Sequence, residues 1–211
     1  METRGAEALL TQRDTTVVKE RISKAYRIRQ IDEPLRRRRT KLEARLIREA
    51  RRAGVATPQI IDEQEFSIRM EFIGGRRVKE FVNAKNYKAV AQKIGQGIAQ
   101  MHNYDIIHGD LTTSNMIISD GKERSGSQKK GIAKPITLYF IDFGLGFISR
   151  RPEDKATDLH LLKEAIVATH FSIAEKFWTA VLNAYSRNYT DSGKVIKALH
   201  KIEMRGRYVE R

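Results

Sequence analysis

The chain has 211 residues, 40% of them hydrophobic, which is enough to bury a core in one compact unit with room for two small lobes. It has no cysteine, which excludes disulfide bonds, thiolate metal sites and a cysteine nucleophile. The net charge of +14 points to a polyanionic partner such as RNA, with a solvated, charge-rich surface as the alternative. No apolar run approaches the length that crosses a bilayer, and the first residues lack the apolar core of a signal peptide, so we expect a cytoplasmic protein without membrane contact.

The first third of the chain predicts a β-rich unit. Residues 15–19 carry β-branched side chains and predict a strand ending at Lys19, with a hairpin before it. Thr40 and Glu43 have the spacing of an N-cap and its capping-box partner, so a helix is expected to begin at Thr40 and to close at Gly54 and Pro58. Two further strands are predicted over 60–61 and 66–72, followed by a glycine pair at 74–75 that suits a hinge.

The rest of the chain predicts mainly helices. Apolar residues between Tyr87 and Met101 repeat on one helical face. Residues 116–118 and 136–141 predict a pair of strands, and the polar stretch 120–134 between them is interpreted as a mobile loop whose lysines contact tRNA or are simply solvated. Three more helices are expected, over 152–170, 172–188 and 192–205.

Two motifs predict a phosphoryl-transfer site. His108-Gly109-Asp110 is followed by Asn115, and the strand over 136–141 ends in Asp142-Phe143-Gly144. Asp110 would orient the attacking oxygen and accept its proton late, while Asn115 and Asp142 would supply the oxygen donors that Mg²⁺ prefers. A lone aspartate in a loop is normally a turn residue, but both motifs in this order, each beside a strand, favour the kinase-type site.

Two other groups of residues are predicted to hold the nucleotide phosphates. Lys19 can reach them if Glu43, on the following helix, pairs with it, and this order of strand and helix is typical of kinases. Gly5, Ala6 and Glu7 stand where a phosphate-covering glycine loop lies in kinases, although an ordinary hairpin turn explains them nearly as well.

The base of the nucleotide is assigned to a second set. The backbone around Met70, Glu71 and Ile73 is predicted to meet the adenine, with a simple strand ending as the alternative, and Ile141 is predicted to line the site next to Asp142. The expected fold class is therefore α+β. It is a minimal bilobal protein-kinase-like fold, with a β-rich nucleotide-binding lobe over residues 1–74 and a reduced helical lobe with a basic tail over residues 75–211.

At these motifs, together with residues 40–45, 153–159 and 205–207, the chain resembles the PRPK family of atypical kinases and ATPases, which is related to the RIO kinases and belongs to the KEOPS complex. The resemblance is to the compact archaeal form and covers nearly the whole length. Generic protein kinases have arginine in place of Gly109, a glycine-rich loop and an activation segment that ends in Ala-Pro-Glu, and the sequence has none of these.

The resemblance implies a nucleotide and magnesium site, with ATP and Mg²⁺ as cofactors, formed by Lys19, Glu43, Asp110, Asn115 and Asp142. It implies that Asp154 and Asp158 help to hold the catalytic loop, and that a basic tail with Arg205 and Arg207 approaches the partner and the tRNA. The implied partners are the Kae-type subunit, which transfers a threonylcarbamoyl group to adenosine 37 of tRNA, and other KEOPS subunits. The implied activity is chiefly that of an ATPase, with autophosphorylation on serine or threonine as a side activity.

Two other functions are compatible with parts of the sequence. Small-molecule phosphotransferases of the aminoglycoside-kinase type share His-Gly-Asp and the downstream asparagine and aspartate, but the short helical lobe and the Arg-Gly-Arg tail argue against them. A non-catalytic RNA-binding scaffold subunit is disfavoured by the complete set of site residues.

Overall fold

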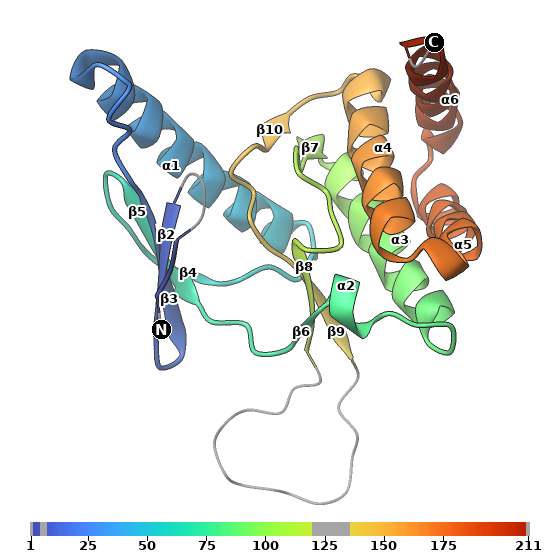
Figure 1. Cartoon of the computed structure of the whole chain (residues 1–211), viewed down its shortest axis with the longest axis horizontal. Coiled ribbons are helices and arrows are strands. Elements are labelled where there is room, and N and C mark those ends of the chain that lie inside the picture. Colours follow the sequence, from blue (N-terminus) through green and yellow to red (C-terminus); the bar gives the residue numbers. More distant parts are fainter. Residues whose placement is uncertain (1, 5–7, 120–135, 210–211) are drawn as a thin grey trace, which may run out of the picture.

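The computed structural model describes residues 2–4, 8–119 and 136–209, except the side chains of Arg4 and of residues 206–209. Figure 1 shows a β-rich lobe on the left and a helical lobe on the right, so the fold is α+β and bilobal as predicted. The predicted phosphate-loop residues 5–7 and the stretch 120–134 lie outside the described residues. The division of the chain at residues 74 and 75 remains an interpretation.

The β-rich lobe is an antiparallel sheet with one long helix packed on it. The strands lie in the order β1-β2-β3-β5-β4 and comprise β1 (Glu2–Arg4), β2 (Ala8–Arg13), β3 (Thr16–Arg21), β4 (Ile60–Glu63) and β5 (Ser67–Glu71). Within β3, Lys19 and Arg21 are buried and Glu20 between them is exposed, because successive side chains of a strand point to opposite faces. The register pairs Lys19 with Ile68 on the neighbouring strand β5.

Helix α1 (Arg29–Arg52) follows this strand, and its predicted start at Thr40 is wrong. Thr40 lies inside the helix, where its hydroxyl donates to the Arg36 carbonyl oxygen at 2.9 Å, a back-bond that serine and threonine make in helix interiors. Pro34 lies within the helix even though it removes one backbone donor. The end is as predicted, since the helix stops at Arg52 and Gly54 adopts a left-handed φ of +85°.

The rest of the chain contains the predicted long helix and the predicted strand pair. A three-stranded sheet of order β6-β8-β9 lies between the lobes and is formed by β6 (Arg76–Arg77), β8 (Met116–Ser119) and β9 (Thr137–Phe140). A short strand pair is made of β7 (Ile106–Ile107) and β10 (Phe147–Ile148). The helices are α2 (Val78–Phe81), α3 (Tyr87–Asn103), α4 (Pro152–Thr169), α5 (Ala174–Asn188) and α6 (Ser192–Val209), with a 3-10 turn at Phe171–Ile173.

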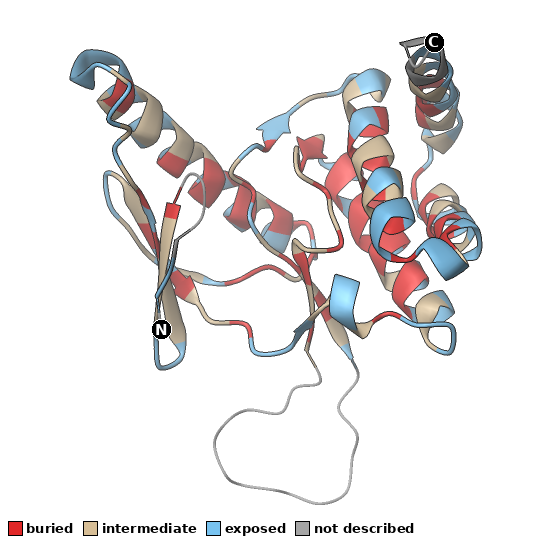
Figure 2. Ribbon diagram, in the orientation of Figure 1, coloured by how far each residue is buried: buried red, intermediate tan, exposed pale blue. Residues whose placement is uncertain are grey.

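One hydrophobic core connects the two lobes. The inner face of α1, with Leu46, Ile47 and Ala50, belongs to the same buried cluster as α3 and α5 of the helical lobe. Figure 2 shows this as a band of buried residues that runs from the second half of α1 into the helices on the right. The sheet side of α1 has only the small cluster of Ala44, Ile68 and Met70 among the described residues. Helix α1 therefore packs on the sheet and also contributes its inner face to the core of the helical lobe.

None of the helices in the described ranges combines the length and the apolar character needed to cross a membrane.

Candidate active site

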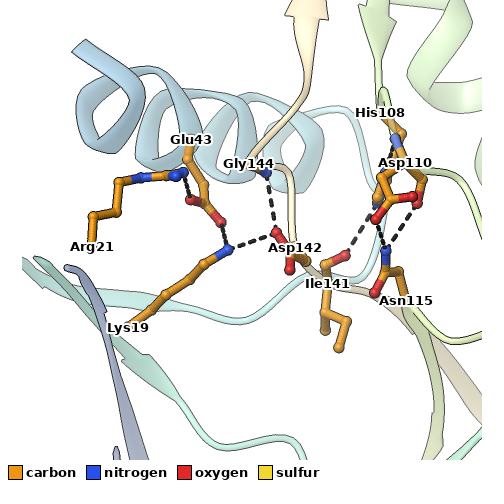
Figure 3. Close-up of polar contacts among 9 residues, drawn as sticks. All are labelled: Lys19, Arg21, Glu43, His108, Asp110, Asn115, Ile141, Asp142 and Gly144. Carbon is orange, nitrogen blue, oxygen red and sulfur yellow. Dashed lines mark hydrogen bonds and ion pairs between the residues drawn. The ribbon is translucent and has the colours of Figure 1, made fainter. Parts of the chain in front are cut away.

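Three of the predicted residues meet between the lobes. The Lys19 Nζ atom lies 2.6 Å from Glu43 Oε1 and 2.6 Å from Asp142 Oδ1, so one ammonium group bridges two carboxylates. Figure 3 shows the three side chains converging from β3, from α1 and from the segment after β9. Lys19 and Glu43 are buried, whereas the Asp142 side chain is 48% exposed. The Asp142 carboxylate is therefore open to solvent, whereas the Lys19–Glu43 ion pair is buried.

Local sequence explains why these side chains converge. Glu43 lies in the interior of α1, about four turns from its start, and it pairs with Lys19 of β3 rather than capping a helix. Asp142 has a positive φ of +64°, which is uncommon for a residue with a Cβ atom and carries a conformational cost of about 1–3 kcal/mol. The contacts of Asp142 with Lys19 and with the Gly144 N–H, at 3.3 Å, hold it in this conformation.

The charges of this cluster stabilise one another. Burial opposes the charged form of Lys19, but the Glu43 and Asp142 carboxylates outweigh it and raise the pKa of the ammonium group. Burial likewise opposes ionisation of Asp142, and Lys19 outweighs it, so the pKa of the carboxyl group is lowered. Both groups are therefore charged at neutral pH.

Asp110 and Asn115 form the other side of the site. Asn115 Nδ2 donates to Asp110 Oδ2 at 2.7 Å and to the Asp110 carbonyl oxygen at 3.0 Å. In Figure 3 Asp142 lies between Lys19 and this pair. Because the amide nitrogen of Asn115 donates to Asp110, its Oδ1 oxygen is the atom of this side chain that can serve as a metal ligand.

The donor atoms suit magnesium better than a metal that needs a full protein cage. The described part of the chain has no group of three or more histidine, cysteine, aspartate or glutamate side chains that could hold an ion. Asn115 Oδ1 and the Asp142 carboxylate are hard oxygen donors, and Mg²⁺ takes one or two such ligands and completes its shell with phosphate oxygens and water.

Asp158 on α4 holds the loop that carries Asp110. Its Oδ2 accepts from the His108 N–H at 2.6 Å, and its Oδ1 accepts from the Gly109 N–H at 2.8 Å. The His108 ring is buried, its Nε2 lies 3.2 Å from the Ile141 carbonyl oxygen, and burial lowers the pKa of the imidazole. A neutral ring that donates from Nε2 therefore ties the loop to the residue before Asp142.

Gly109 has a structural reason to be glycine. Its φ is +78°, and a Cβ atom there would overlap the Leu145 carbonyl oxygen. The segment after Asp142 thus runs directly across the loop, and an arginine side chain at this position has no room.

Three more residues were assigned to supporting and tail roles, and they lie on α4 and α6. Asp154 accepts from the Ser149 hydroxyl at 2.6 Å, at the start of α4, and its role in holding the catalytic loop remains a prediction. Arg205 and Arg207 lie on α6, which continues to Val209 instead of ending at residue 205. They belong to a helix rather than to an extended tail, and Arg205 is exposed.

The residues predicted to meet the base lie at the end of β5, just beyond it, and after β9. Met70 is buried in β5 opposite Val17 of β3. Glu71 donates its backbone N–H to the Gln59 carbonyl oxygen at 2.9 Å, and Ile73 is buried just beyond the strand. Ile141 donates its backbone N–H to the Asn115 carbonyl oxygen at 3.0 Å. Contact of these residues with a nucleotide remains a prediction.

Arg21 is a site residue that the sequence reasoning missed. Its Nη2 atom lies 2.5 Å from Glu43 Oε2, so one oxygen of Glu43 pairs with Lys19 and the other pairs with Arg21. The signal was present, because Arg21 follows Lys19 by two residues and must point to the same face of the strand.

Two family models match the chain. The RIO domain matches residues 10–124, which include Lys19, Glu43, Asp110 and Asn115. The lipopolysaccharide kinase (Kdo/WaaP) family matches residues 76–185. The fold and the site thus define a RIO-type, kinase-like protein.

Curated relatives make the family specific. The chain is 38% identical to "Probable serine/threonine-protein kinase BUD32 homolog" of Archaeoglobus fulgidus, over 98% of this chain and 95% of the relative. It is 40% identical to "KEOPS complex subunit Bud32" of Pyrococcus abyssi, over 92% and 85% of the two chains. The chain belongs to the Bud32 family of RIO-type atypical kinases.

A longer relative contains a similar unit. The chain is 42% identical to "Probable bifunctional tRNA threonylcarbamoyladenosine biosynthesis protein" of Methanobrevibacter smithii, over 91% of this chain. It spans only 33% of that protein's length.

Solved structures support the fold alone. WaaP in complex with acyl carrier protein has a TM-score of 0.66 at 16% identity, over 96% of this chain and 87% of that chain. The Rio2 kinase from Chaetomium thermophilum, in its ADP/Mg²⁺-phosphoaspartate complex, has a TM-score of 0.63 at 15% identity, over 97% and 70% of the two chains.

Proposed function

We propose that this protein is a magnesium-dependent ATPase and atypical serine/threonine kinase that acts within a KEOPS complex and supports threonylcarbamoyl modification of tRNA adenosine 37. The observation that carries the proposal is the convergence of Lys19, Glu43 and Asp142 opposite the Asp110–Asn115 pair. The names of the Bud32 relatives and of the bifunctional tRNA threonylcarbamoyladenosine biosynthesis protein support its biological setting.

Each residue has a chemical task in this proposal. Lys19, held by Glu43, reaches the nucleotide phosphates, and Asn115 Oδ1 with the Asp142 carboxylate would hold Mg²⁺. When bound, the ion would neutralise phosphate charge that develops during transfer. Asp110 orients the attacking oxygen and takes its proton, and Asn115 fixes the Asp110 carboxylate through its amide N–H.

The proposed partners are a Kae-type threonylcarbamoyltransferase subunit, other KEOPS subunits and tRNA. The net charge of +14 favours contact with a polyanion. Exposed Arg205 on α6 belongs to the proposed face toward the partner and the tRNA. Relatives in which a similar unit makes up a third of a longer protein fit a function exerted beside another domain.

The test is phosphate release and self-labelling from γ-labelled ATP with magnesium. Wild type and Asp110→Ala are compared, each alone and with the Kae-type subunit plus tRNA. The proposal expects release that depends on Asp110 and rises with the partner and tRNA, while self-labelling stays flat or falls. Release that is equal in both proteins, or labelling that dominates and ignores the partner, would contradict it.

A further inference from the structure

The Glu43 carboxylate forms ion pairs with two cations, although one cation is enough to neutralise its charge. Lys19 Nζ lies 2.6 Å from Oε1 and Arg21 Nη2 lies 2.5 Å from Oε2, with all three side chains buried. Lys19 also contacts Asp142 Oδ1 at 2.6 Å, so two cations face two carboxylates in one cluster. Among the described contacts of this cluster, Lys19 is the member that contacts both carboxylates.

Arg21 is held in place from several directions. Its backbone N–H donates to the Phe66 carbonyl oxygen at 2.8 Å, and its own carbonyl oxygen accepts from Arg36 Nη1 at 3.2 Å. Arg36 in turn packs over the Phe66 ring and bonds Asp32 Oδ2 at 2.6 Å. The guanidinium group reaches the edge of the site, because a Cβ atom on Gly144 would lie 3.1 Å from Arg21 Nη2.

We propose that Arg21 is a positioning residue that occupies the second oxygen of Glu43 and thereby leaves the charge of Lys19 for the nucleotide phosphates. This inference rests on the proposed function. If Asp142 held Mg²⁺ and Lys19 contacted a phosphate, Glu43 would still be paired with Arg21, so its buried charge would remain neutralised. Without Arg21, Lys19 would be the cation that neutralises the buried Glu43 carboxylate, and its interaction with the phosphates would be weaker.

The test compares Mg-ATP dissociation constants and kcat for phosphate release. Arg21→Gln removes the positive charge of this side chain, and Arg21→Lys keeps it. Arg45→Gln is the matched control, since Arg45 is exposed and pairs with Glu49, with both residues on α1. We expect Arg21→Gln to weaken Mg-ATP binding about tenfold, with a smaller change in kcat, because a charge-assisted bond within the cluster is lost. Arg21→Lys should stay within about threefold of wild type and Arg45→Gln should match it.

A second background shows whether Arg21 acts through Glu43. In Glu43→Gln protein the further change Arg21→Gln should leave the Mg-ATP dissociation constant unchanged, because the carboxylate it serves is absent. This comparison holds even if Arg21→Gln alone does not fold, since the double variant has no unpaired buried carboxylate at this position.

Four outcomes of these measurements bear on the inference. Unchanged binding by Arg21→Gln overturns the inference, and so does an equal loss in the Glu43→Gln background, which would mean direct contact of Arg21 with the nucleotide. Wild-type protein that binds no Mg-ATP overturns the proposed function itself, and with it the role of Arg21. Loss in Arg21→Gln, retention in Arg21→Lys and no effect beside Glu43→Gln support the inference.

Discussion

Replacing Asp158 with asparagine should destabilise the fold far more than the same change at Asp154. The Asp158 carboxylate accepts two backbone N–H groups, from His108 at 2.6 Å and from Gly109 at 2.8 Å. An asparagine has one carbonyl oxygen, so one of these donors would face an NH₂ group instead of an acceptor. The lost charge-assisted bond and the unmatched buried donor together amount to about 3–5 kcal/mol.

The Asp154 variant is the matched control. Its carboxylate contacts the Ser149 hydroxyl at the start of α4, and an asparagine oxygen can accept the same bond, so the expected loss is about 1 kcal/mol or less. Urea unfolding followed by circular dichroism measures both free energies, and the Asp158 variant should also melt about 10 °C lower. Equal stabilities of the two variants would refute the assignment of Asp158 as the support of the catalytic loop.

Two further predictions concern close packing and pH. Gly97→Ala on α3 places a Cβ atom into the buried Phe140 ring and should lower the free energy of unfolding by about 1–3 kcal/mol. The control Gly193→Ala has open space around it and should be neutral or slightly stabilising. Urea unfolding measures both free energies, and similar values for the two variants would contradict the prediction. Burial lowers the pKa of His102 and His108, so the folded chain binds fewer protons than the unfolded chain below a pH of about 6.5. The contribution of the two histidines to the free energy of unfolding is complete above that pH and declines as the pH falls toward their lowered pKa values, by up to about 1.4 kcal/mol per pH unit for each histidine. Unfolding at about pH 7.5 and at about pH 5.5 measures the decline. Equal stability at these two pH values would contradict the prediction.

Those parts of the site that depend on chain order could be predicted from the sequence. The order of strand and helix placed Lys19 and Glu43 together, and the structure has them 2.6 Å apart. Asp110 and Asn115, five residues apart in one loop, were both expected in the site, and they are joined by a hydrogen bond. Such contacts follow from local spacing and from the twofold alternation of a strand.

Other features depend on tertiary contacts and were missed. The helix start was placed at Thr40 because Thr40 and Glu43 mimic a capping box. In the structure Pro34 is accommodated within α1, and Glu43 is used by Lys19 and Arg21. Local propensity is a weak guide where buried charges fix a helix.

The two acidic residues at the start of α4 illustrate the same limit. Asp154 and Asp158 lie one helical turn apart and were given one role. Only the packing of α4 against the loop shows that Asp158 accepts from His108 and Gly109, whereas Asp154 accepts from Ser149.

The most direct test of the account is the binding of ATP by wild type and by Asp142→Ala, measured by calorimetry with and without magnesium. The account predicts that magnesium strengthens binding to wild type and that this gain is lost in the variant, because the exposed Asp142 carboxylate is the charged donor for the ion. An undiminished magnesium-dependent gain in Asp142→Ala would contradict the proposed site.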